Sequence, residues 1–361
     1  MIRLLDLVAP GNGQGEPGRA GAVVEQPPEA PGEAFGVFVS RGGFQVALSA
    51  AFMLLTVAVV YRGISGGIER VSKILMPVLF GILLLLLVSA LTMDGAGQAL
   101  TFIFAPDFSR LHADSVLEAL GHSFFTLSLG MGAMITYGSY LSRHESIVGS
   151  ALIVVVLDTL IAAAATVIMF SVIFSVPGMS DTIGASTVGM LFISLPHLFY
   201  TNVPFGVILA PLFYLLVAFA ALTSTISLLE VIVSYFIDQR RWSRARAAIV
   251  CGLGTLALSM VCALSLGAVP ALSTFAVFGT KQGALANLDH LASNWLLPVG
   301  GFFITFGTGW LMTRRQTEEE LMDGTAPRWF RYGLWRFFIR WVSPAAVGAI
   351  IVAVMLGKDF S

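Results

Sequence analysis

The sequence contains few charged residues and almost no cysteine. Only 11% of its 361 residues are Asp, Glu, Lys or Arg, whereas soluble domains carry about a quarter. A mean hydropathy of +0.86 and a hydrophobic content of 57% indicate a chain that crosses a membrane several times. The two cysteines, Cys251 and Cys262, lie in one apolar segment. They form no metal-ligand set, so we interpret them as packing residues.

The chain also lacks a recognisable signal peptide and any acidic or basic tail. Its first apolar run is short and is interrupted by Asp6. Residues 10–35 are rich in Pro, Gly and Glu, which predicts a poorly ordered N-terminal tail over residues 1–43. A transmembrane domain at 44–357 and a short C-terminal tail at 358–361 are expected to follow. Nothing in the charge pattern indicates nucleic-acid binding.

Apolar segments of spanning length fill the rest of the chain. A helix needs roughly 20 apolar residues to cross the hydrocarbon core of a bilayer. The sequence therefore predicts an all-α polytopic membrane protein with about eight transmembrane helices. The predicted spans are 44–61, 71–93, 119–141, 147–174, 206–237, 245–267, 291–313 and 335–357.

The loops between these segments alternate in charge. Basic residues gather in four loops, with four Arg in 238–246 and five Arg in 313–336. The intervening loops hold one basic residue or none each. The positive-inside rule places the basic loops in the cytoplasm, so both termini, and with them the N-terminal tail, are expected outside. The expected location is the inner or plasma membrane.

The segment "FTLSLGMGAMITY" is unusual for the middle of a membrane span. It contains Ser128, Gly130 and Gly132. One interpretation is that the helix unwinds there, since freed backbone groups at membrane depth are tolerated where they face protein or a cavity. The other is that the glycines permit close helix packing. The segment alone favours neither.

A hydroxyl cluster and one acidic residue add to this pattern. The stretch "FAALTSTISLLE" (219–230) has four Ser or Thr residues within five positions, which favours a polar face toward a cavity. Hydroxyl and carbonyl oxygens without several carboxylates suit Na⁺ better than a divalent ion. Asp158 lies deep in the fourth span, where a charge is costly and marks a functional candidate. Thr126 and Asp158 are candidates to meet across neighbouring helices and hold a cation.

Together these segments resemble the neurotransmitter:sodium symporter family, in particular bacterial sodium-dependent amino-acid transporters with the LeuT fold. "RGISGGIERVSKILMP" resembles the loop between the family's fourth and fifth helices, and "FFTLSLGMGAMITYGSYL" its unwound sixth helix. "ALTSTISLLE" resembles the eighth helix and "LDHLASNWLLP" the start of the tenth. The eight spans would be the family's helices four to eleven, giving a partial LeuT-like fold.

The resemblance implies a role for individual positions. Those similar to sodium ligands are Thr126, Asp158, Ala220, Thr223 and Ser224. Those similar to substrate-pocket residues are Phe125, Thr126, Ser128, Met131, Thr225 and Leu228. Those similar to gate residues are Tyr140, Asp238 and Asp289. Asp158 would supply the fixed negative charge that chloride supplies in animal relatives, so chloride is not expected.

One part of the family pattern is missing from the sequence. The Gly-rich first helix of the family has no counterpart here, and residues 1–43 hold no apolar run of spanning length. The sequence is therefore interpreted as an N-terminally truncated member that lacks the first three helices. In the family these helices carry half of each sodium site and the arginine partners of the gate acids.

Two functions follow from this comparison. The first is sodium-coupled symport of a neutral or hydrophobic amino acid by alternating access, in a lipid bilayer and incomplete as an isolated chain. The alternative is a non-transporting remnant, or one half of a split transporter that needs a partner chain with the first three helices. An enzyme is not expected, because the five His residues fall in separate segments and form no catalytic set.

Overall fold

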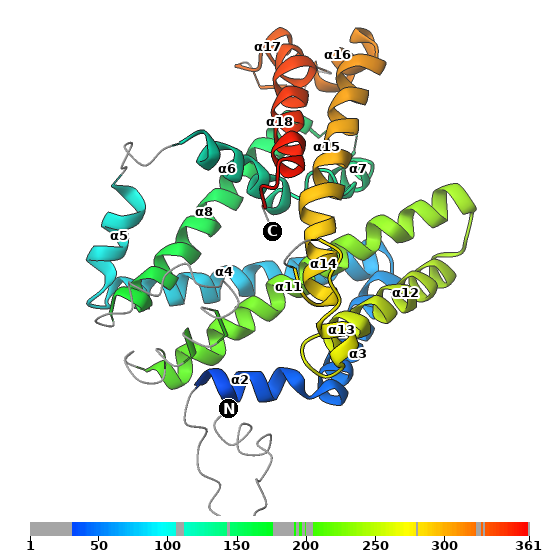
Figure 1. Ribbon diagram of the computed structural model, residues 1–361. Coiled ribbons are helices and arrows are strands. Elements are labelled where there is room, and N and C mark those ends of the chain that lie inside the picture. The colour runs from blue at the N-terminus through cyan, green and yellow to red at the C-terminus, as the bar shows by residue number, and fades with distance from the viewer. Residues whose placement is uncertain are drawn as a thin grey trace, which may run out of the picture.

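The computed structural model describes residues 31–105, 112–142, 145–175, 191–192, 195–196, 199, 205–278, 281–322, 326–327 and 329–359. Every regular element in these ranges is a helix, and short π-helical stretches carry the label η (Figure 1). In chain order the elements are α2 (Pro31–Ser40), α3 (Gly42–Tyr61), η1 (Ile64–Ile68), α4 (Glu69–Leu91), α5 (Ala96–Phe104), α6 (Ala113–Thr126), α7 (Ala133–Gly138), α8 (Ile147–Phe174), α11 (Gly206–Arg240), α12 (Arg244–Leu264), α13 (Pro270–Ser273), α14 (Ala284–His290), η5 (Leu291–Leu296), α15 (Leu297–Phe306), η6 (Gly307–Leu311), α16 (Arg314–Met322), α17 (Tyr332–Phe337), η7 (Phe338–Val342) and α18 (Ser343–Met355).

Six helices of the described chain are long and apolar enough to cross a membrane. They are Gly42–Tyr61, Ile64–Leu91, Ile147–Phe174, Gly206–Arg240, Arg244–Leu264 and Tyr332–Met355. A seventh candidate is Ala284–Leu311 with Arg314–Met322, which bend by 104° at the residues between them. The span predicted at 119–141 is divided into α6 and α7. The total of eight stays a prediction.

Helix α11 is the centre of the larger helix group. It packs against α3, α4 and α12, and its buried side chains belong to two separate apolar clusters. Leu209 and Phe213 near its start join the cluster formed with α4 and α8, whereas Ile226 and Val233 join the cluster formed with α3 and α12. Because the α11 side chains that face these two clusters are buried, other segments can contact α11 only on its remaining side.

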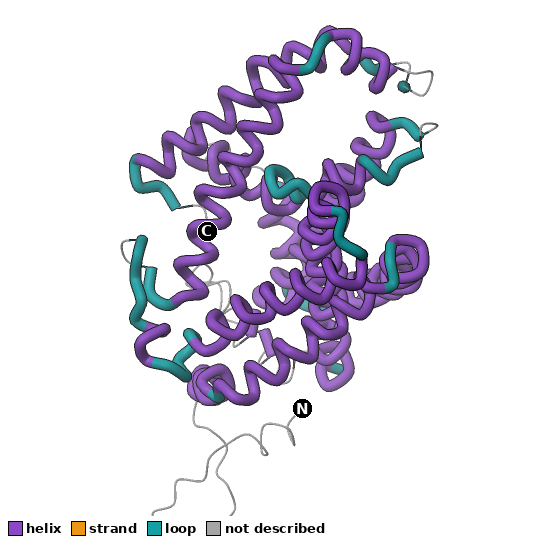
Figure 2. The backbone as a smooth tube through the Cα atoms, turned by 90° about the vertical axis from the view of Figure 1, so that its right-hand side faces the viewer, coloured by secondary structure: helices purple, strands orange, loops and turns teal. Residues whose placement is uncertain are grey.

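The second helix group contains α6, α15 and α18. Figure 1 shows α15 and α18 side by side, with α16 and α17 at one end of the pair, and Figure 2 shows the same helices from the side. Helix α6 packs against both α15 and α18. The break between α6 and α7 therefore lies where the two groups meet, because α7 packs against α11.

Contacts between loops agree with the predicted alternation of sides. Arg244, after the basic α11–α12 turn, donates through Nε to the carbonyl of Val60 at the end of α3, at 2.9 Å. At the other set of loops, Lys281 Nζ lies 2.6 Å from Asp359 Oδ2 in the C-terminal tail. The first contact joins two of the loops expected in the cytoplasm. The second joins the C-terminal tail to a loop that is also expected outside.

The last part of the predicted N-terminal tail, 1–43, is described, whereas its poor order as a whole stays a prediction. Residues Pro31–Ser40 form α2, and Phe38 makes an edge-on contact with Phe44 of α3 at 5.6 Å between ring centroids. Residues 1–30 of the predicted tail lie outside the described residues.

Candidate functional site

The segment between α6 and α7 is not helical. Helix α6 ends at Thr126 and α7 begins at Ala133. Three residues between them have positive φ: Ser128 at 53°, Gly130 at 80° and Gly132 at 81°. A left-handed residue ends α-helical geometry, and Ser128 holds this conformation without the freedom of glycine. Unwinding, one of the two interpretations of this segment, therefore occurs.

The glycines also allow a very close approach to α15, so the alternative of close packing holds as well. A Cβ on Gly130 would lie 2.3 Å from the carbonyl oxygen of Leu297, and one on Gly300 would lie 2.2 Å from the carbonyl oxygen of Gly130. On the other side, a Cβ on Gly132 would lie 3.3 Å from Val231 of α11. The unwound segment is held between α15 and α11.

Unwinding leaves a row of carbonyl oxygens available. Thr136 donates to the carbonyl of Gly132, and Leu129 to that of Phe124, at 3.0 and 2.8 Å. Between these two acceptors lie the six carbonyls from Thr126 to Met131. None of the six accepts a hydrogen bond from the described part of the chain. Unpaired carbonyls at membrane depth are costly unless another group binds them, and a cation is the group that such carbonyls coordinate.

The residues in and beside the hydroxyl cluster of α11 fall into an exposed group and a half-buried group. Ala220, Ser224 and Leu228 are exposed and repeat every four residues, so they form one open face of the helix. Thr223 donates to the carbonyl of Ala220 at 2.8 Å. Thr225 is half-buried, with its Oγ1 3.2 Å from Oγ1 of Thr56 on α3.

A direct side-chain bond links α7 to this cluster. Tyr137 OH donates to Ser227 Oγ at 2.9 Å, and Ser227 Oγ donates onward to the carbonyl of Thr223 at 3.0 Å. The bond fixes α7 at one height along α11. It thereby sets where the unwound segment lies relative to the hydroxyl residues.

The two residues predicted for the first sodium site lie on different helices. Thr126 is exposed at the end of α6, and its hydroxyl is 3.4 Å from the carbonyl of Ser123. Asp158 is half-buried on α8, in a run from 151 to 162 whose other side chains are all exposed. No hydrogen bond or ion pair joins Thr126 and Asp158 within the described residues. The structure thus assembles neither residue into a closed site.

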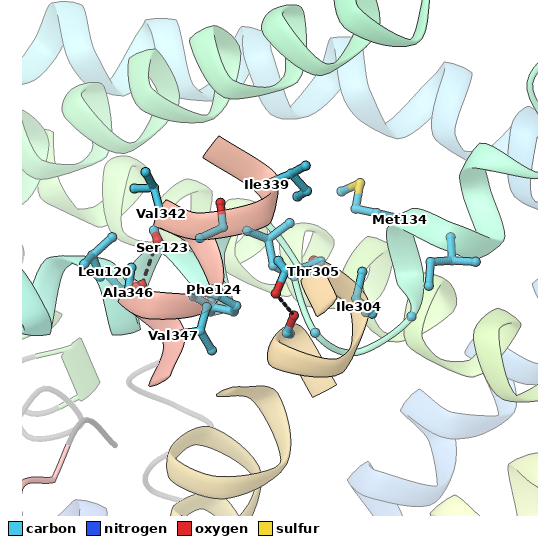
Figure 3. A pocket seen from close by; sticks show the side chains of 17 residues that line it. Leu120, Ser123, Phe124, Met134, Ile304, Thr305, Ile339, Val342, Ala346 and Val347 are labelled. Carbon is cyan, nitrogen blue, oxygen red and sulfur yellow. Dashed lines mark hydrogen bonds between the residues drawn. The ribbon is translucent and has the colours of Figure 1, made fainter. Parts of the chain in front are cut away.

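An apolar cavity lies beside the unwound segment, on the side facing α15 and α18. Its volume is about 450 Å³, and side chains from α6, α7, α15 and α18 face into it (Figure 3). Ser128 is the only predicted substrate-pocket residue among the described residues that line this cavity. Phe125 is exposed and Met131 half-buried, and neither lines this cavity. Thr225 and Leu228 are on α11, which contributes no residue to its lining.

The predicted gate residue Tyr140 contacts an acidic residue that the sequence reasoning missed. Tyr140 OH donates to Glu230 Oε1 at 2.8 Å, and Glu230 Oε2 lies 2.5 Å from Arg244 Nη2. Glu230 is fully buried. A charged residue within an apolar span is the signal that selected Asp158, and the same rule would have selected Glu230.

The two other predicted gate residues are exposed. Asp238 is in the last turn of α11, two turns beyond Glu230. Asp289 is on α14 and accepts from Ser293 Oγ at 3.3 Å. Neither forms an ion pair within the described residues.

The family model of the sodium:neurotransmitter symporter family matches residues 37–358. The chain belongs to this family. It is 34% identical over 303 residues to the uncharacterized sodium-dependent transporter YhdH of Bacillus subtilis, an alignment that covers 84% of this chain and 65% of that protein. It is 29% identical over 308 residues to an uncharacterized sodium-dependent transporter of Haemophilus influenzae, covering 84% and 64% of the two chains.

A solved structure gives the fold. The crystal structure of MhsT in complex with L-phenylalanine matches with a TM-score of 0.78 and 36% identity, covering 91% of this chain and 72% of that chain. The chain therefore has a partial LeuT-like fold and is a multi-pass membrane protein of a transporter family, not an enzyme. It spans just under two thirds of the length of the two bacterial relatives.

Proposed function

We propose that this chain carries the sodium and substrate sites of a sodium-coupled symporter for neutral or hydrophobic amino acids. The observation that carries the proposal is the row of carbonyls from Thr126 to Met131 that accept no hydrogen bond from the described chain, on a segment that lies against Val231 of α11 at Gly132. Carbonyl and hydroxyl oxygens at the middle of a span suit a monovalent cation. Sodium is here the co-transported ion.

Sodium binding is assigned to two sets of oxygens. The first set is Thr126 and Asp158, and the second is the Ala220 carbonyl with the Thr223 and Ser224 hydroxyls. The second set is supported by the open face that Ala220 and Ser224 share on α11. In the first set, the Asp158 carboxylate adds a fixed negative charge, so coupling is expected to need no chloride.

The substrate class follows from the side chains at the break. Phe125 and Met131 offer an aromatic ring and a flexible thioether to an apolar side chain. Ser128, Thr126, Thr225 and Leu228 complete the proposed pocket. MhsT, the structural relative, is in complex with L-phenylalanine, which supports an apolar amino acid for this chain as well.

The proposed inner gate includes the bonded group Tyr140–Glu230–Arg244 with Asp238 close by in sequence. These contacts tie the turn after α7 to α11, α12 and the end of α3, at the end where the basic loops lie. Opening that end requires the Tyr140 bond to break. Asp289, on α14, is assigned to the outer gate.

Uptake by proteoliposomes tests the proposal. Radiolabelled L-phenylalanine should accumulate when a Na⁺ gradient is imposed, and Asp158→Ala should abolish the accumulation. Thr166→Val is the matched control, because Thr166 is on the same helix and its hydroxyl only bonds back to Ala162. Replacing chloride by gluconate should leave uptake unchanged. Uptake that ignores the Na⁺ gradient would refute the proposal.

The second candidate is half of a split transporter, and the surface of α8 favours it. Eleven of the twelve residues from 151 to 162 are exposed around all sides of the helix, and the carboxylate of Asp158 has no partner in the described chain. A carboxylate at membrane depth needs a protein partner. Uptake should therefore be compared for this chain alone and for this chain co-expressed with the first three helices of the Bacillus relative. Uptake only with the added helices indicates a split transporter, and no uptake in either case indicates a remnant.

A further inference from the structure

A second, polar cavity lies far along the chain from the unwound segment. It has a volume of about 290 Å³ and is lined by the start of α16 and by residues of α17 and η7. Figure 1 shows α16 and α17 at the same end of the α15 and α18 pair. The described residues that line it include three arginines and three aromatic residues, and none of them carries a carboxylate. They are Arg314, Tyr332, Gly333, Arg336, Phe337, Arg340 and Trp341.

Two of the three guanidinium groups, those of Arg336 and Arg340, have no carboxylate partner within the described residues. Arg314 Nε donates to Glu318 at 3.0 Å, in a pair that is largely exposed to solvent. Arg336 Nη1 donates to two neutral hydroxyls, Thr317 Oγ1 at 3.1 Å and Tyr332 OH at 2.9 Å. The guanidinium of Arg340 lies 4.2 Å above the Trp310 ring, and its buried Nε has no acceptor within the described residues.

This arrangement is unfavourable unless an anion is bound. A buried donor without an acceptor costs free energy, and like charges four residues apart on a helix, such as Arg336 and Arg340, repel each other. An anion between them would reverse both effects. Guanidinium groups bind phosphate oxygens through paired donors, so phosphate is the anion that this cavity suits best.

The arginines are also held in position before any ligand binds. Thr317 and Tyr332 are buried, with their hydroxyl oxygens 2.7 Å apart, and Tyr332 OH is 3.1 Å from the carbonyl of Arg314. Trp310 Nε1 donates to the carbonyl of Arg340 at 3.1 Å. These contacts reduce the entropy that the arginine side chains lose on binding.

The surroundings indicate that the phosphate belongs to a lipid. Phe337 and Trp341 line the cavity yet are 55% and 56% exposed, and the neighbouring Leu334 and Trp329 are each 59% exposed. Exposed aromatic and apolar side chains next to basic residues are typical of the membrane interface. The loop 313–336 is on the side expected in the cytoplasm, where anionic lipids are concentrated.

We propose that this cavity binds the phosphate headgroup of an anionic phospholipid in the cytoplasmic leaflet. The arginines hold the phosphate, while Phe337 and Trp341 contact the start of the acyl chains. The site is separate from the proposed sodium and substrate residues, so it stands or falls independently of the transport function. Its occupation would fix the bend between α15 and α16 and the start of α18.

Lipid binding to the purified full chain tests the site. Native mass spectrometry should detect phosphatidylglycerol bound in preference to phosphatidylcholine. Arg336→Gln with Arg340→Gln should lower the phosphatidylglycerol affinity by about tenfold or more, because two charge-assisted contacts to the phosphate are lost. Arg62→Gln with Arg70→Gln is the matched control, because it removes two exposed arginines from another basic loop. An equal loss in this control, or equal binding of both lipids, would overturn the proposal.

Two further measurements keep the test decisive if the double variant does not fold. A phosphatidylglycerol analogue with a diazirine beside its headgroup should label the wild-type chain within residues 329–343, and labelling confined to other segments contradicts the site. Inorganic phosphate should compete weakly. If phosphate at equal concentration displaces the lipid completely, the cavity is a site for free phosphate and the lipid assignment is wrong.

Discussion

Glu230 Oε2 on α11 lies 2.5 Å from Arg244 Nη2 on α12, and the Glu230 side chain is completely buried. The same carboxylate accepts from Tyr140, and the same guanidinium donates to the Val60 carbonyl. One ion pair therefore connects four segments of the chain. Its charges are largely removed from solvent, so each depends on the other for neutralisation.

Removing either partner of this pair should destabilise the chain by different amounts. Arg244→Met leaves a fully buried carboxylate and should cost roughly 3–5 kcal/mol. Glu230→Met should cost less, because the Arg244 side chain is 25% exposed and can turn toward solvent. The double variant should recover most of the loss, since an apolar pair of similar volume carries no buried charge.

Thermal unfolding in detergent micelles measures these effects. Arg315→Gln is the control, because Arg315 forms its ion pair with Glu319 on the exposed side of α16, and exposed pairs contribute about 0–1 kcal/mol. A double variant as unstable as Arg244→Met alone would contradict the account of the pair.

The two tyrosines after the break provide a matched comparison. Tyr140→Phe removes a hydrogen bond to the Glu230 carboxylate, worth about 1.5–3 kcal/mol. Tyr137→Phe removes a bond to the neutral Ser227 hydroxyl, worth about 0.5–1.5 kcal/mol. The loss of unfolding free energy should therefore be larger for Tyr140→Phe. The reverse order would mean that Glu230 does not need the Tyr140 hydroxyl.

Glycine substitutions separate backbone conformation from close packing. Gly130→Ala should be the most destabilising, since it combines a positive φ, worth about 1–3 kcal/mol, with the contact to Leu297. Gly300→Ala keeps an ordinary helical conformation and should be destabilised by the contact with Gly130 alone. Gly348→Ala has no atom within 4 Å of the new Cβ and should be neutral or stabilised by about 0.5–1 kcal/mol.

Melting temperatures of the three glycine variants, measured side by side, test this order. If Gly130→Ala unfolds at the same temperature as Gly348→Ala, then the unwound segment is not held against α15 as described.

The sequence predicted the break at Ser128 and Gly130 but did not distinguish unwinding from close packing. Both occur. The close packing is against the carbonyl of Leu297, about 170 residues later in the chain. Only the three-dimensional arrangement brings that carbonyl to Gly130. The apolar spans were readable because their length and composition are set by the bilayer itself.

Glu230 and Arg244 were missed for a different reason. The rule for charges in apolar spans could have identified Glu230. Its partner Arg244, however, lies beyond the turn at Arg241, where a φ of 52° reverses the chain. Helical periodicity does not predict contacts across such a turn. Similarly, α2 was not predicted because Pro and Gly dominate the residues before it.

The central claim is that the carbonyls of the unwound segment and the hydroxyls of α11 bind sodium together with an amino acid. Its most direct test is equilibrium binding of radiolabelled L-phenylalanine to the purified chain, with and without the added helices, during a sodium titration against constant ionic strength. Half-maximal binding should require much more sodium in Thr223→Val with Ser224→Ala than in the control Thr255→Val, whose hydroxyl bonds only to Cys251 on α12. Equal sodium dependence in the wild-type chain, the double variant and Thr255→Val, or equal binding when potassium replaces sodium, would contradict the claim.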